Sequence, residues 1–143
     1  MRIVAIDYGR KRCGVAVTDP LQIAANSLPV VRTCDLPDFI KTYCSREEVE
    51  RILIGQPKQM NGEPSESMRY ITPFVNALKK SLPHIPLEMV DERFTSVIAH
   101  REMLAAGFKK SDRQRKGLAD EMSAVIILNT WLESRDRFRA LNH

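Results

Sequence analysis

The spacing of the first two apolar runs limits the folds open to this chain more than any other feature. Residues 2–7 form a short run rich in β-branched side chains, and a second such run, 14–18, follows after a brief basic turn. Runs of this length and composition predict strands, and so short a connection indicates a hairpin. A third strand is predicted over 28–33. The chain is therefore expected to open with three antiparallel strands.

Helical and strand periodicities alternate after this meander. Helices are predicted over 36–47 (with Asp35 as the N-cap), 65–82, 95–106 and 118–137, and strands over 51–55 and 87–90. Alternating strands and helices form parallel units, and right-handed crossovers place strands four and five beside strand one. We expect an α/β fold with a five-stranded mixed sheet of order 3-2-1-4-5, its first three strands antiparallel, flanked by helices.

The length of the chain predicts one domain. At 143 residues it falls within the usual size of a single domain. We expect that domain to span residues 1–137, followed by a flexible tail over 138–143.

Carboxylate side chains stand at the ends of three apolar elements. Asp7 ends the first strand, Asp91 and Glu92 end the fifth, and Asp120 begins the last helix. A carboxylate beside an apolar element is costly to desolvate unless something pairs with it, and a divalent cation can pair with several at once. The carboxyl ends of parallel strands meet at one edge of the sheet, with strands one and five roughly 10 Å apart. The pattern predicts a Mg²⁺ or Mn²⁺ site there.

Each acid also has a purely structural interpretation. Asp7 could cap the hairpin turn, the Asp91-Glu92 pair could form surface ion pairs, and Asp120 could complement the dipole of the last helix. Because side chains alternate along a strand, only one of Asp91 and Glu92 should face the metal. The sequence leaves open which of the two it is.

The excess positive charge is confined to one segment. The chain carries 22 basic and 18 acidic side chains. Residues 107–117 hold five basic side chains and one acidic side chain, so the rest of the chain is balanced, with 17 basic and 17 acidic side chains. Such a segment is either a solvated loop or, beside a metal site, a contact for a phosphate backbone. The predicted nucleic-acid contacts are Arg10, Lys11, Arg12, Arg93, Lys109, Lys110, Arg113, Arg115 and Lys116.

The composition argues against several other classes of protein. No apolar run approaches the roughly 20 residues of a membrane helix, and the first residues show no signal-peptide pattern. The three cysteines lack CxxC spacing, which favours reduced thiols in the cytoplasm. The three histidines lack zinc-ligand spacing. We expect a cytoplasmic protein with no membrane partner, either a monomer or a weak homodimer.

Four motifs occur in a fixed order along residues 2–132. They are Asp7-x-Gly9-x-Lys11-Arg12-x-Gly14-x-Ala16-x-x-Asp19, Gly55-x-Pro57-x-x-x-Asn61-Gly62, Asp91-Glu92-Arg93-Phe94-Thr95-Ser96 and Asp120-x-x-Ser123-Ala124-x-x-Ile127-Leu128. Together they resemble the YqgF family, also called RuvX, of the RNase H-like superfamily. The resemblance implies an RNase H-like fold and a cytoplasmic nuclease that matures the small-subunit (pre-16S) ribosomal RNA precursor. Carried over by position, its catalytic and metal-binding acids are Asp7, Glu92 and Asp120.

The leading hypothesis is thus a metal-dependent endo- or exonuclease acting on structured RNA. The likeness of the family to RuvC implies one alternative, a Holliday-junction resolvase acting on branched DNA. A second alternative is a non-catalytic binding factor in ribosome assembly or transcription, because Gln56 stands where several RNase H-like nucleases have an acid near the end of strand four. A nucleotide-binding ATPase is disfavoured, since the kinase-like Asp-x-Gly hairpin that residues 7–14 resemble works in two-domain proteins.

Overall fold

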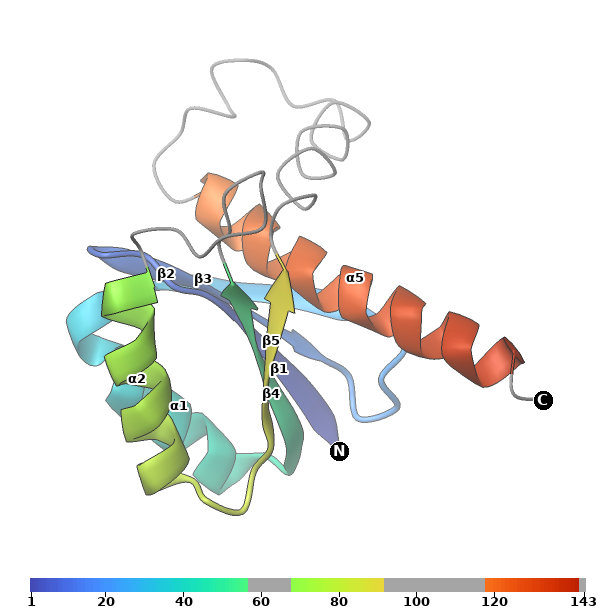
Figure 1. Cartoon of the computed structure of the whole chain (residues 1–143), viewed down its shortest axis with the longest axis horizontal. Coiled ribbons are helices and arrows are strands. Elements are labelled where there is room, and N and C mark those ends of the chain that lie inside the picture. Colours follow the sequence, from blue (N-terminus) through green and yellow to red (C-terminus); the bar gives the residue numbers. More distant parts are fainter. Residues whose placement is uncertain (57–67, 92–117, 142–143) are drawn as a thin grey trace.

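A five-stranded sheet forms the centre of the protein (Figure 1). The computed structural model describes residues 1–56, 68–91 and 118–141. The strands are β1 (Arg2–Asp7), β2 (Arg12–Thr18), β3 (Ala25–Arg32), β4 (Val49–Gln56) and β5 (Leu87–Asp91), in the order β3-β2-β1-β4-β5. The first three strands are antiparallel, whereas β4 runs parallel to β1 and β5 parallel to β4. The predicted fold class, strand order and orientations are confirmed.

Helices cover both faces of this sheet (Figure 1). On one face lie α1 (Leu36–Arg46) and α2 (Met68–Ser81), and on the other lies α5 (Leu118–Leu141). None of the described helices is both long and apolar enough to cross a lipid bilayer. The predicted helix 95–106 lies outside the described residues.

Alternation along β1 divides the core into two clusters. Val4 and Ile6 pack with α1 and α2, whereas Ile3 and Ala5 pack beneath α5. All four side chains are fully buried. Successive side chains of a strand point to opposite faces, and both faces are covered, so the whole run is apolar. Asp7 continues the series of Ile3 and Ala5 and therefore falls on the α5 face.

Two element ends differ from the sequence expectation. Asp35 precedes α1 but its side chain makes no capping bond, because it ends a 3-10 turn, η1 (Thr33–Asp35), with a helical backbone (φ −96, ψ −10) instead of the extended one that a cap needs. The last helix includes residues 138–141, where a tail was expected. Beyond the last buried residue of the helix, Arg135 contacts Gln22 of the β2–β3 loop.

The β2–β3 connection is organised by Asp19. Its Oδ1 accepts hydrogen bonds from the backbone N–H groups of Ile23 and Ala24, both at 2.8 Å, and its Oδ2 accepts one from Leu21 at 3.2 Å. Bonds to the charged form favour it, so the backbone N–H groups of Ala24 and then Ile23 hold the pKa of Asp19 below its ordinary value. Gln22, inside the loop, has a left-handed backbone with φ 58.

We expect Asp19→Ala to lower the melting temperature at neutral pH, because three backbone N–H groups lose their acceptor. The pKa of Asp19 is lower in the folded protein than in the unfolded chain, where it is near 3.8, so the charged carboxylate stabilises the fold above that pH. This stabilisation is lost as the pH falls through the pKa of Asp19 in the folded protein. Thermal unfolding from about pH 7 to about pH 2.5 measures this. The difference in melting temperature between wild type and Asp19→Ala should become smaller below pH 3.8. A difference in melting temperature that stays constant with pH would contradict the role of the charge. The melting temperature of Asp19→Asn should fall between those of wild type and Asp19→Ala.

Candidate active site

Three parallel strands bring Asp7, Gln56 and Asp91 to one edge of the sheet. Asp7 is the last residue of β1, and its register partner in β2 is Gly14. β4 ends at Gln56 and β5 at Asp91, and these two residues are also register partners. Figure 1 shows that α5 begins at the same end of the molecule, where β4 and β5 terminate. The edge predicted to carry the site is thus formed.

Asp91 lies on the opposite face of the sheet from Asp7. In β5, Met89 packs with the α1 and α2 cluster, and Val90 packs with the α5 cluster. Alternation therefore gives Asp91 the face of Met89. Of the two acids that the sequence left open, Asp91 does not share the face of Asp7, and Glu92 lies outside the described residues.

Gln56 also points away from the face of Asp7. It continues the series of Ile52 and Ile54, which belong to the α1 and α2 cluster. Its amide therefore does not stand in the place of an acid beside Asp7. The residue of β4 next to Asp7, one step beyond the Ile6–Ile54 pair, is Gly55, and a glycine leaves this face of the edge without an intervening side chain.

The other predicted metal ligands are described only in part. Asp120 is the third residue of α5, in its first turn, and its side chain lies outside the described part of the chain. Among the residues that the structure describes, no group of three or more His, Cys, Asp or Glu side chains is arranged to hold a metal. The proposed ligand set therefore combines Asp7, which is described, with two carboxylates that are not. The predicted contacts outside the described residues are Arg93, Lys109, Lys110, Arg113, Arg115 and Lys116.

The turn after Asp7 closes tightly around Gly9. The Thr33 hydroxyl donates to the Gly9 carbonyl oxygen at 2.6 Å, and the Gly9 N–H donates to Cys13 Sγ at 3.4 Å. A Cβ at position 9 would lie 2.2 Å from the carbonyl oxygen of Arg12. Only glycine fits this close approach of two backbone segments. The position of Asp7 thus depends on a turn that tolerates no side chain.

Basic and aromatic side chains surround the tip of the β1–β2 hairpin. The predicted contacts Arg10 and Lys11 are exposed, and Arg12 is half-buried at the start of β2. The Arg10 guanidinium lies 4.6 Å from the ring centroid of Tyr70, and that of Arg69 lies 5.2 Å from the same ring. Neither Arg69 nor Tyr70 was expected from the sequence, where the only signal is a basic-aromatic pair near the start of a predicted helix.

A second aromatic contact ties the hairpin to α2. The rings of Tyr8 and Phe74 lie 5.0 Å apart between centroids, at 35°. Burial raises the pKa of the Tyr8 hydroxyl above its ordinary value. Tyr8 therefore stays protonated at neutral pH and serves as a packing group here, not as a base.

Comparison with known proteins adds a family match over almost the whole chain. A family model described as "RuvX: Holliday junction resolvase" matches residues 1–134. Relatives from Bacteroides fragilis and Bacteroides thetaiotaomicron, both named "Putative pre-16S rRNA nuclease", are 63% identical over 134 residues, which is 94% of this chain and 97% of each relative. A relative of the same name from Porphyromonas gingivalis is 55% identical over 136 residues, covering 95% of this chain and 99% of its own.

Solved structures share the fold at low sequence identity. Thermus thermophilus RuvC in complex with a Holliday junction substrate has a TM-score of 0.59 at 15% identity, covering 94% of this chain and 95% of that one. The fowlpox virus resolvase with Holliday junction DNA has a TM-score of 0.52 at 12% identity, covering 94% and 99%. These similarities confirm the RNase H-like fold and, at such identities, nothing more.

Proposed function

The chain belongs to the RuvX family, and from this premise we propose that it is a metal-dependent nuclease that processes the precursor of 16S ribosomal RNA. The observation that carries the proposal is the 63% identity, over 97% of their length, to relatives whose name states that activity. The edge of the sheet where β1 ends at Asp7 supports the proposal, because it places a carboxylate where the reaction could take place. The proposed reaction is hydrolysis of phosphodiester bonds.

Asp7, Glu92 and Asp120 are the proposed catalytic acids and metal ligands. Alternation along β5 favours Glu92 over Asp91, because Asp91 takes the face opposite to Asp7. Three carboxylates form a donor set that suits a hard divalent cation such as Mg²⁺ or Mn²⁺. Such an ion, when bound, supplies Lewis-acid activation of the scissile phosphate and of a water molecule.

The residues around the hairpin are proposed to hold the substrate. The backbone of Asp7 is held by its pairing with Gly14 of β2 and by the β1–β4 pairing that ends one residue before it, so the backbone needs little reorganisation on binding. Arg10 and Lys11 are exposed beside it and would contact phosphate oxygens, together with Arg12, Arg93 and the basic residues of 109–116. Contacts of this kind position a nucleic-acid backbone without selecting its sequence.

We further propose that the protein works in the cytoplasm, as a monomer or weak homodimer. The thiols of Cys34 and Cys44 are free, as in proteins of a reducing compartment. The proposed partner is RNA. The description of the matching family favours one second candidate substrate, a four-way DNA junction.

Cleavage of the two substrates by the wild-type protein tests the function. A precursor 16S RNA fragment and a four-way DNA junction are each incubated with Mg²⁺, Mn²⁺ or EDTA. We expect cutting of the RNA with either metal and none in EDTA, because the three carboxylates cannot act without their cation. Cutting of the junction alone would transfer the proposal to DNA. Binding of either substrate without any cutting would support a non-catalytic factor instead.

A further inference from the structure

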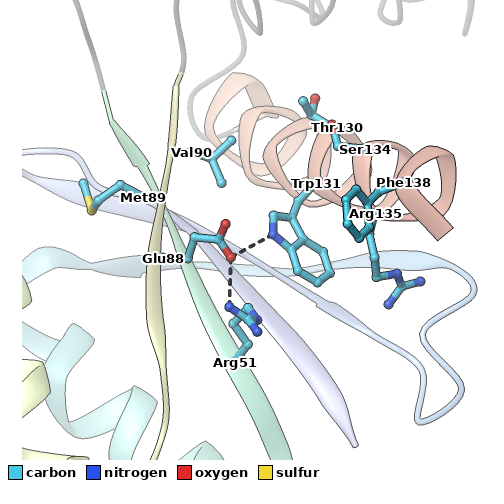
Figure 2. A pocket seen from close by; sticks show the side chains of 9 residues that line it. All are labelled: Arg51, Glu88, Met89, Val90, Thr130, Trp131, Ser134, Arg135 and Phe138. Atoms are coloured by element: carbon cyan, nitrogen blue, oxygen red, sulfur yellow. Dashed lines mark hydrogen bonds and ion pairs between the residues drawn. The ribbon is translucent and has the colours of Figure 1, made fainter. Parts of the chain in front are cut away.

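A concave surface lies along the outer strand of the described sheet, between β5 and the second half of α5 (Figure 2). Its volume is about 650 Å³, within the usual range for a ligand site. Glu88 and Val90 line it from β5, and Trp131, Arg135 and Phe138 line it from α5. We call this surface the β5–α5 cleft. Asp7, the proposed catalytic acid whose side chain the structure describes, does not line it.

The β5 wall presents a carboxylate that is held at one oxygen only. Glu88 Oε2 accepts hydrogen bonds from Arg51 Nη1 at 3.0 Å and from Trp131 Nε1 at 2.9 Å. Both bonds go to Oε2, and Figure 2 shows the other oxygen directed away from these donors, toward Val90. No described residue bonds to that oxygen, Oε1. The wall thus offers a fixed acceptor for an N–H group.

The α5 wall presents rings and guanidinium groups. Trp131, Arg135 and Phe138 are spaced four and three residues apart and share one face of the helix. The guanidinium carbons of Arg51 and Arg135 each lie 5.4 Å from the centroid of the Trp131 ring. Phe138 is 68% exposed. Planar surfaces of this kind attract a flat aromatic ligand by stacking.

We propose that the β5–α5 cleft binds an unpaired nucleobase of the substrate strand. A nucleobase is planar, so it can cover Phe138, and its ring or amino N–H groups can donate to Glu88 Oε1. Two arginines line the cleft, Arg51 and Arg135. They are ion-paired with Glu88 and with Asp136, respectively, and the remaining N–H groups of each guanidinium can contact the attached phosphates. A protein segment added along β5 would take its main hydrogen bonds from the strand backbone and would not require an acceptor at Glu88 Oε1 or an aromatic ring at position 138.

The position of the cleft agrees with this ligand. Glu88 precedes Asp91 by three residues in β5, which places it roughly 10 Å from the catalytic edge. A strand whose backbone lies at that edge can therefore turn a neighbouring base into the cleft. The inference rests on the proposed function, because it assumes that a nucleic acid occupies the edge.

Trp131 is the only tryptophan of the chain, so intrinsic fluorescence reports on the cleft directly. We would titrate the wild-type protein in EDTA with a single-stranded RNA oligonucleotide and follow emission and anisotropy together. We expect binding to quench Trp131, and Phe138→Ala to raise the Kd roughly tenfold, as for loss of one base stack. Leu141→Ala is the matched control, since Leu141 is 86% exposed on the same helix and does not line the cleft.

The outcomes separate this inference from the proposed function. Quenching by RNA that Phe138→Ala weakens would support the cleft even if the protein cut no RNA, in which case the proposed function alone fails. RNA binding seen by anisotropy with unchanged Trp131 emission, or no RNA binding at all, would overturn the cleft even if cleavage were intact. Equal effects of Phe138→Ala and Leu141→Ala would overturn it too. Emission that changes with protein concentration alone would mark a self-association surface instead.

Discussion

Asp7→Asn is expected to reduce metal-dependent cleavage by roughly a thousandfold or more, the scale seen when a group at a reaction centre is removed. The amide keeps the shape of the side chain but lacks the negative charge that a hard cation requires. Asp7 stands at the end of β1 and is only half-buried, so the fold should survive. Melting temperature and RNA binding in EDTA should therefore change little.

The measurement compares cleavage rates of wild type and variant, purified identically, on the same RNA fragment. Asp91→Asn is the matched control, because Asp91 ends β5 at the same edge but takes the opposite face. We expect this variant to keep most of its activity. Full activity of Asp7→Asn, or an equal loss in both variants with unchanged melting temperatures, would show that the catalytic face has been assigned wrongly.

Gly9→Ala is expected to destabilise the protein by about 3 kcal/mol, the upper part of the range for overpacking. The new Cβ would meet the carbonyl oxygen of Arg12 at 2.2 Å, a distance that the backbone must widen. Neither backbone segment can move easily, because the Thr33 hydroxyl is hydrogen-bonded to the Gly9 carbonyl and Arg12 is paired with Arg32 of β3. Since Asp7 lies two residues away, activity should also fall in the fraction that remains folded.

Urea denaturation of wild type and Gly9→Ala measures the loss of stability. Thr33→Val provides a graded comparison, because it keeps the side-chain shape and removes only the 2.6 Å hydrogen bond to the Gly9 carbonyl. We expect it to cost about 1 kcal/mol. A Gly9→Ala variant as stable as wild type would mean that the turn rearranges freely and does not fix Asp7.

The sheet was predictable because its signals are local. The short turn after β1 allows only a hairpin, and the handedness of the crossovers then places β4 and β5 beside β1. The fully apolar run of β1 also indicated that both of its faces are covered. The length of α5 was not predictable, since the pattern of buried apolar residues ends at Leu132 whereas the helix continues to Leu141.

Which face of the sheet each acid occupies was also not predictable, for a related reason. Alternation along a strand predicts that Asp91 and Glu92 point to opposite faces, but it does not show which face belongs to Asp7. That choice depends on the register between strands and on which helices cover which face. The β5–α5 cleft could not be predicted from the sequence either, because Arg51, Glu88 and Trp131 come from three elements far apart in the sequence.

The placement of α5 also governs the order of events during synthesis on the ribosome. All five strands and the helices of the opposite face emerge first, but Ile3, Ala5 and Leu53 lack the cover that α5 gives them until the last segment is made. A nascent chain that lacks this segment presents one apolar side of its sheet to the cell. The same segment carries Asp120, in the first turn of α5. Under the proposed assignment, completion of the core and assembly of the catalytic centre are thus a single event, because a chain that lacks α5 also lacks one of the three acids.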